Sequence, residues 1–127
     1  KAAERFAFIA YSHTPDDVVV TYCNGLRGRA WPKERKMEAP EPTTRRRLQV
    51  YLHEVAHIVL NHVGKKPVHV QEMEAEQWSF AIMRAEGVSV PRKSIRNAKR
   101  YVAKKIRRAM MNGALRIDPK AASFAKR

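Results

Sequence analysis

His53, Glu54 and His57 have the types and spacing that most clearly indicate chemistry in this chain, because they form the pattern H-E-x-x-H. On a helix, four residues advance about 400°, so the two histidines lie within about 40° of each other and can reach one metal ion. Glu54 lies about 100° round from His53, where its carboxylate can face a water molecule on that metal. It can then take a proton from the water as the oxygen attacks a peptide carbonyl. We therefore predict hydrolytic chemistry with Glu54 as the general base.

The metal needs a third protein ligand, and the stretch EMEAE (72 to 76) provides candidates. Zinc accepts imidazole nitrogen and carboxylate oxygen in a tetrahedron that keeps one position open for water. Glu72 and Glu76 share a helix face, whereas Glu74 points away from both. We predict one Zn²⁺ per chain, with Glu72 as the third ligand and Glu76 as the carboxylate that orients a metal-bound histidine. The reverse assignment, with Glu76 as ligand, stays open, and His69 is a further candidate.

His62 follows the H-E-x-x-H motif closely in the sequence, but it is less suitable as the third metal ligand than this closeness suggests. It follows His53 by nine residues, about 900° of rotation, which places it on the opposite side of a continuing helix. A third histidine ten residues after the first would need a glycine at position 60, where this chain has Leu60. We predict a surface or helix-end histidine.

The residues before the motif predict strands that pack on the metal-site helix. An aromatic and apolar run at 6–11, a turn at 14–17 and a β-branched run at 18–23 are typical of a hairpin. Asn24-Gly25 then marks a turn into a third short strand within 26–31. The Pro-rich stretch that follows predicts a loop with one short edge strand near 36–39.

Helices follow from residue 43 onward. Thr43 or Thr44 offers an N-cap, and apolar residues then recur at three- and four-residue steps through Val59, so this amphipathic helix carries the motif. Gly64-Lys65-Lys66-Pro67 breaks it, and a second helix runs from about Val70 to a stop at Gly87. Pro91 opens a third helix, which ends near Gly113, and Asp118-Pro119 caps a short last one.

Charge divides the chain into a nearly neutral body and a basic tail. Residues 1–90 carry 13 basic and 11 acidic side chains, whereas residues 91–127 carry 13 basic side chains and one acidic, Asp118. The third helix has an apolar stripe, so one side of it is packed and the tail is not merely a disordered arm. Its cations either form a solvated face or contact nucleic acid. In the second case we expect contacts with phosphates rather than stacking on bases, because Tyr101 is the one aromatic residue among these cations. The candidate nucleic-acid contacts are Arg96, Lys99, Arg100, Lys104, Arg107 and Arg108.

Length and composition limit the number of domains and the classes of protein to which this chain can belong. The 127 residues, 44% of them hydrophobic, suffice for the core of one domain. A single cysteine, Cys23, excludes an internal disulfide. We find neither an apolar window of membrane-spanning length nor a signal sequence, and therefore expect a soluble cytoplasmic protein with no membrane partner.

Two stretches, HEVAHIVLNH (53 to 62) and EMEAEQWSFA (72 to 81), resemble the ImmA/IrrE-type, gluzincin-like metallopeptidases. Members of that family typically show H-E-x-x-H-x-x-L-x-H on one helix and E-x-E-A-[D/N]-x-F-A on the next. The likeness covers about residues 45 to 85. Glu76 replaces the usual Asp or Asn, and Trp78 stands where Phe is common.

The resemblance implies an α+β fold, a minimal zincin-like domain in which a small sheet packs on the active-site helix. From the residue pattern itself we expect one domain, in which 1–42 supply strands and loop, 43–87 the metal-site helices and 88–127 a basic helical tail that is not assigned to the family's common core. The resemblance also implies that His53, His57 and Glu72 bind zinc with Glu54 as general base. Members commonly cleave repressor-like DNA-binding regulators, which would give the basic tail a purpose.

These observations favour a zinc-dependent endopeptidase whose protein substrate is a DNA-bound regulator. A second hypothesis is a SprT-like protease acting on DNA-bound proteins, in which a histidine replaces Glu72 as ligand. A third is a non-catalytic nucleic-acid-binding or antirestriction-like module whose zinc site is structural or vestigial, although such a site is normally closed by four protein ligands.

Overall fold

The chain folds into five helices and a three-stranded mixed sheet within the residues that the computed structural model describes, 1–64 and 66–126. Lys65, in the predicted break after the motif helix, and Arg127, at the end of the basic tail, lie outside the described residues. The elements follow in the order α1 (Ala2–His13), β1 (Val19–Cys23), β2 (Arg29–Trp31), β3 (Lys36–Pro40), α2 (Arg45–Val59), α3 (Val68–Ala85), α4 (Arg92–Met111) and α5 (Pro119–Ala125).

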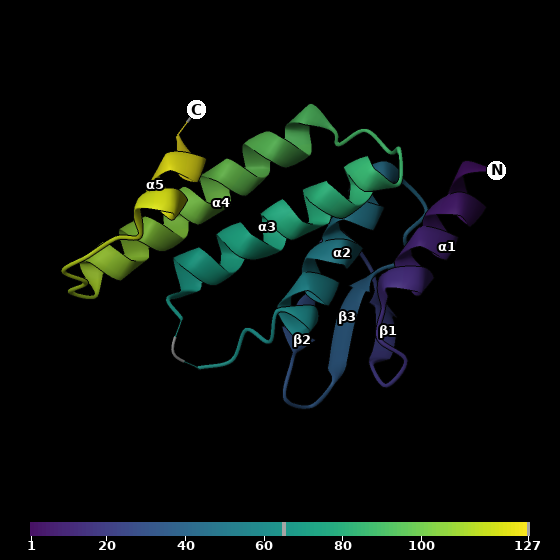
Figure 1. Ribbon diagram of the computed structural model, residues 1–127, viewed down its shortest axis with the longest axis horizontal. Coiled ribbons are helices and arrows are strands. Elements are labelled where there is room, and N and C mark those ends of the chain that lie inside the picture. The colour runs from purple at the N-terminus through teal and green to yellow at the C-terminus, as the bar shows by residue number, and fades with distance from the viewer. Residues whose placement is uncertain (65, 127) are drawn as a thin grey trace.

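Helix α2 is the centre of the fold. It packs against α1 and strands β2 and β3 on one side and against α3 on the other, and α3 in turn contacts α4 and α5. Figure 1 shows the resulting succession, from α1 and the sheet at one end of the molecule, through α2 and α3, to α4 and α5 at the other end. The predicted α+β class is confirmed.

The N-terminal strand predicted at 6–11 is wrong, because those residues belong to α1 and no hairpin forms there. Phe6, Ile9 and Ala10 are buried, which is the three- and four-residue spacing of a helix face. Phe8 and Tyr11 are 70% and 78% exposed. A strand would instead have placed Phe6 and Phe8 on one face. The strand was predicted from the aromatic content of this segment, whereas the spacing of its buried apolar residues determines that it is a helix.

The sheet has the order β1-β3-β2, which corrects the predicted edge position of the strand near 36–39. Strand β3 lies in the middle, parallel to β1 and antiparallel to β2. Met37 and Ala39 alternate into the core, and the prolines that suggested an edge stand at the ends of this strand or beyond them.

The helix boundaries agree with the capping signals in the sequence. The Thr44 side chain accepts a 3.1 Å hydrogen bond from the backbone N–H of Arg47 at the start of α2. Helix α3 ends at Ala85 and is followed by Gly87 with a φ of +76°, a left-handed conformation that glycine adopts without strain. None of the described helices combines the length and hydrophobicity needed to span a membrane.

Two apolar clusters fix the helices that carry the site. The larger one joins α1, the sheet and α2, with Leu48, Leu52 and Val55 of α2 at its centre. The smaller one fastens α4 and α5 onto the N-terminal half of α3 through Val70, Met73, Val102 and Ala121. The polar face of α2 is thereby held against α3, with the basic helix α4 beside it.

Candidate metal centre

Two histidines of α2 and one glutamate of α3 converge on a single point. The Nε2 atoms of His53 and His57 lie 3.1 Å apart, and the Glu72 carboxylate reaches them at 3.0 and 3.3 Å, respectively. In a tetrahedral zinc centre with bonds of about 2.0–2.1 Å, neighbouring ligand atoms lie about 3.3–3.4 Å apart. The three side chains therefore lie close enough to bind one metal ion.

Glu76 contacts the outer nitrogen of His53 instead of joining this group. Its Oε1 lies 3.0 Å from His53 Nδ1 and accepts a 2.6 Å hydrogen bond from the buried amide of Gln49. This arrangement favours Glu72 over Glu76 as the carboxylate that would contact a metal ion directly. Sequence reasoning missed Gln49, although its position one helical turn before His53 was a usable signal.

His62 lies just past the end of α2 and is buried, so the helix-end alternative of the prediction is confirmed and the surface alternative is wrong. Helix α2 ends before it, and Asn61, with a φ of +54°, turns the chain back toward the helix. His62 is 9% exposed, and its Nδ1 lies 2.8 Å from the Nδ1 of His57. The predicted angle of about 900° failed because it assumed a helix that continues past position 60.

A chain of polar contacts extends outward from His62. Its Nε2 lies 2.9 Å from Oε1 of Glu74, whose two oxygens each accept a 3.1 Å hydrogen bond from the Lys66 ammonium group. Burial raises the pKa of Glu74, but hydrogen bonds from His62 and Lys66 outweigh it and lower that pKa overall. Glu74 is therefore an ionised acceptor, and the N–H of a neutral His62 lies on Nε2.

These contacts determine which ring nitrogen of His53 and of His57 carries the proton. The other nitrogen of each ring then directs its lone pair toward the point where the side chains converge. With its proton on Nε2, His62 can accept at Nδ1, so the Nδ1–H of His57 donates to it. The Nδ1–H of His53 donates to Glu76 in the same way. Both outer nitrogens thus carry the proton, and in the neutral tautomers both Nε2 atoms are available to a metal.

The charges of His53 and Glu72 depend on one another. Burial lowers the pKa of His53, but the attraction of Glu76 and hydrogen bonds to Glu72 and Glu76 raise it well above its ordinary value of 6.5. Burial likewise raises the pKa of Glu72, and contacts with His53 and His57 more than reverse this, holding it far below its ordinary range. Both pKa shifts thus favour positive charge beside the Glu72 carboxylate.

Glu54 lies buried between α2 and β2. Burial raises the pKa of its carboxyl above the ordinary value of 4.5, which suits a general base. A Cβ added to Gly28 would lie 2.7 Å from Cγ of Glu54 and 2.8 Å from the backbone oxygen of Glu38. Only glycine fits there, and the linear sequence held no signal of this contact.

The cluster opens into a cleft of about 740 Å³. One wall is formed by 26–30 and the other by α4, including the predicted nucleic-acid residues Lys104 and Arg108. Tyr101 also lines this cleft, and burial, reinforced by the charges of Glu72 and Glu54, raises the pKa of its hydroxyl to about 12.

No family model, curated protein or solved structure matches this chain. The likeness to ImmA/IrrE-type enzymes therefore rests on the motif residues themselves.

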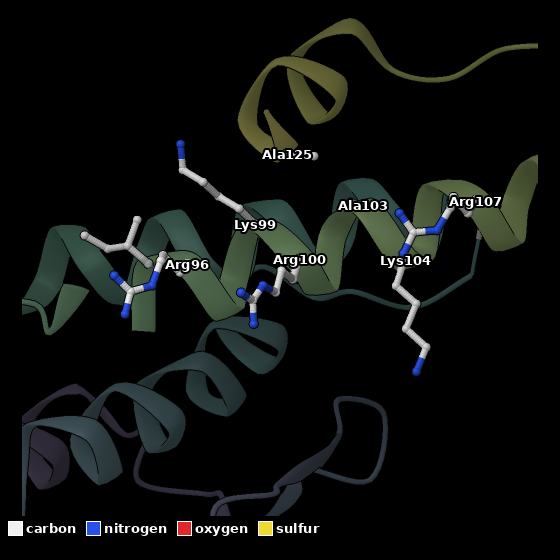
Figure 2. A pocket seen from close by; sticks show the side chains of 8 residues that line it. Arg96, Lys99, Arg100, Ala103, Lys104, Arg107 and Ala125 are labelled. Atoms are coloured by element: carbon white, nitrogen blue, oxygen red, sulfur yellow. The ribbon is translucent and has the colours of Figure 1, made fainter. Parts of the chain in front are cut away.

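The remaining predicted nucleic-acid residues line a second groove, of about 700 Å³, between α4 and α5. Figure 2 shows Lys99 on the α5 side of the helix and Lys104 extending away from α5. Lys104 belongs to the linings of both the groove and the metal cleft. Five of the six predicted cations, Arg96, Lys99, Arg100, Lys104 and Arg107, thus share one groove.

His69, the further candidate ligand, faces another part of the molecule. It is buried in the first turn of α3, and its Nε2 accepts a 3.3 Å hydrogen bond from the backbone N–H of Asp118. The side chain therefore packs toward α5, outside the group formed by His53, His57 and Glu72.

Proposed function

We propose that this chain is a zinc-dependent endopeptidase with a zincin-like fold, in which His53, His57 and Glu72 hold the ion. The observation that carries the proposal is the convergence of two Nε2 atoms and one carboxylate on one point of an open cleft. Two imidazoles and one carboxylate are a donor set typical of catalytic zinc sites, which keep a position open. When bound, a zinc ion lowers the pKa of a water molecule and polarises a peptide carbonyl.

The chain's own residues supply the proton transfers. Glu54, whose pKa is raised by burial, takes a proton from the attacking water and returns it to the leaving amine. Tyr101 keeps its proton at neutral pH and can donate a hydrogen bond to the developing oxyanion from the α4 wall of the cleft. Tyr101→Phe is then expected to lower kcat about 10-fold with KM and zinc content unchanged; an unaltered kcat would remove this role.

The geometry favours this proposal over its two rivals. A SprT-like site would complete the metal with a third histidine, but His62 contacts the outer nitrogen of His57, and His69 faces α5. A structural zinc site is normally closed by four protein ligands, whereas Glu54 and the cleft lie beside the three residues found here. The cationic groove of α4 supports a DNA-bound protein as the substrate.

Cleavage of a peptide mixture by the zinc-loaded protein, followed by mass spectrometry, tests the proposal. The matched control is Glu54→Gln, which keeps the shape of the side chain and the three metal-binding residues. We expect defined cleavage products from the wild type and a loss of at least about 100-fold in Glu54→Gln. Equal activity of the two proteins, or no cleavage by a wild type that holds one zinc, would exclude a Glu54-dependent peptidase.

A further inference from the structure

The charged residues of the metal cleft fall into two groups of opposite sign. Its acidic lining residues are Glu54, Glu72 and Glu76, all at the metal cluster. Every other charged residue in the described lining is cationic, namely Arg27 and Arg29 on one wall and Lys104, Lys105 and Arg108 on the α4 wall. A divalent ion would leave the acidic group with one net negative charge, so the five cations dominate the cleft.

The fold leaves these cations without an acidic partner in the part of the chain that the structure describes, where none of the five forms an ion pair with a carboxylate. Arg29 lies 5.0 Å above the ring of Trp31, and the Lys105 ammonium lies 5.1 Å from the ring of Tyr101. Such contacts hold a cation in place but leave its charge available to a ligand.

We propose that the cleft selects acidic peptide segments, whose carboxylates on either side of the scissile bond pair with the cations of the two walls. This inference rests on the proposed peptidase function and specifies the substrate class of that same site. Carboxylates form short, charge-assisted hydrogen bonds with guanidinium and ammonium groups, and opposed walls of one sign set the register of an oppositely charged chain.

Cleft size favours a peptide over nucleic acid at this position. A volume of about 740 Å³ is that of a site for a drug-sized ligand and accommodates a short extended segment. A duplex, whose major groove alone is about 12 Å wide, is too large to enter it. A single-stranded oligonucleotide carries the same sign of charge and is the competitor that the experiment must include.

The test uses three fluorescent peptides with one central sequence and flanks of Asp/Glu, Ser/Gln or Lys/Arg. Binding to zinc-loaded Glu54→Gln is measured by anisotropy, and cleavage by the wild type is measured separately. We expect the acidic peptide to bind at least about 10-fold more tightly than the neutral one, and the basic peptide most weakly. Equal binding of the three peptides would overturn the proposal.

Charge-reversal variants test which cations of the cleft cause the preference for acidic peptides. Lys105→Glu/Arg108→Glu on one wall, and Arg27→Glu on the other, are each expected to abolish it. The matched control, Arg92→Glu/Lys93→Glu, reverses two cations of the same helix that lie outside the cleft lining and should leave the preference intact. A preference that survives both wall variants, or a six-nucleotide single strand that binds more tightly than the acidic peptide, would contradict the inference.

The two readouts separate this inference from the function on which it rests. Cleavage of all three peptides at equal rates, with equal binding, would keep the peptidase and remove the acidic specificity. Selective binding of the acidic peptide without any cleavage would remove the peptidase and leave an acidic-peptide-binding cleft.

Discussion

The Nδ1 atom of His62 lies 2.8 Å from the Nδ1 atom of His57. This contact continues through Glu74 to Lys66, so a cation, a carboxylate and a neutral imidazole stand in line behind His57, one of the three candidate metal ligands. Burial lowers the pKa of His62, which keeps its ring neutral at pH 7 and able to accept at Nδ1. His62 thereby orients His57 as Glu76 orients His53.

Replacing His62 by alanine should weaken zinc binding by about 10- to 100-fold, because the ring of His57 loses the acceptor that fixes its tautomer. Competition with a chromophoric chelator measures this affinity. The matched control is His13→Ala, since His13 contacts Glu86 far from the cluster and its loss should not change zinc affinity. Indistinguishable affinities of the wild type and His62→Ala would exclude the orienting role.

Gly28→Ala should impair catalysis while leaving the metal in place. The added methyl group would lie 2.7 Å from Cγ of Glu54 and 2.8 Å from the backbone oxygen of Glu38, so Glu54 and the chain around position 28 must shift relative to each other. A displacement of about 1 Å can cost about 100-fold in rate, so we expect kcat/KM to fall by 10- to 100-fold. Zinc content, measured on the same preparation, is the internal control. Unchanged kcat/KM would show that Glu54 does not act from this position.

Zinc binding should release a proton and strengthen as pH rises. The pKa of His53 is raised in the metal-free protein, so below that pKa the ion must displace a proton from Nε2. The apparent affinity then increases about tenfold per pH unit and levels off above the raised pKa. Calorimetry at pH 7 in two buffers of different ionisation enthalpy should show about one proton released per zinc. Identical binding enthalpies in the two buffers would contradict the protonated state of His53.

The groove between α4 and α5 should bind duplex DNA in a salt-dependent manner. Arg100→Glu is expected to weaken binding several-fold at low salt and to reduce the slope of log K against log salt by about one. Lys33→Glu, on the exposed loop between β2 and β3, serves as the control of equal charge change. The same loss in both variants would show that net charge alone, rather than the groove, determines binding.

The spacing of residues in the sequence predicted which side chains of α2 and of α3 lie on the same helix face at the site. His53 and His57 lie one turn apart, and Glu72 and Glu76 lie one turn apart on the next helix, so the pairing within each helix follows from helical geometry. The meeting of the two pairs also needs α3 packed against α2. The misreading of residues 6–11 as a strand gave excessive weight to β propensity, whereas the spacing of Phe6, Ile9 and Ala10 already indicated a helix.

The parts that the sequence did not predict depend on tertiary contacts. His62 reaches His57 because Asn61 reverses the chain, and no regular repeat encodes that turn. Gly28 meets Glu54 only after β2 has packed beside α2. Likewise, the periodicity of α4 indicated which side of that helix is polar, but not that Lys104 and Arg108 would line the metal cleft.

The metal content of the purified protein tests the central claim most directly, which is that His53, His57 and Glu72 form one zinc site. Inductively coupled plasma mass spectrometry after zinc loading and removal of free metal is expected to find one zinc per chain. His57→Ala and Glu72→Gln should each lose most of it, whereas Glu74→Gln should retain it because Glu74 contacts the outer nitrogen of His62 and Lys66 rather than the three converging atoms. A wild type without bound zinc, or undiminished zinc in Glu72→Gln, would contradict the account.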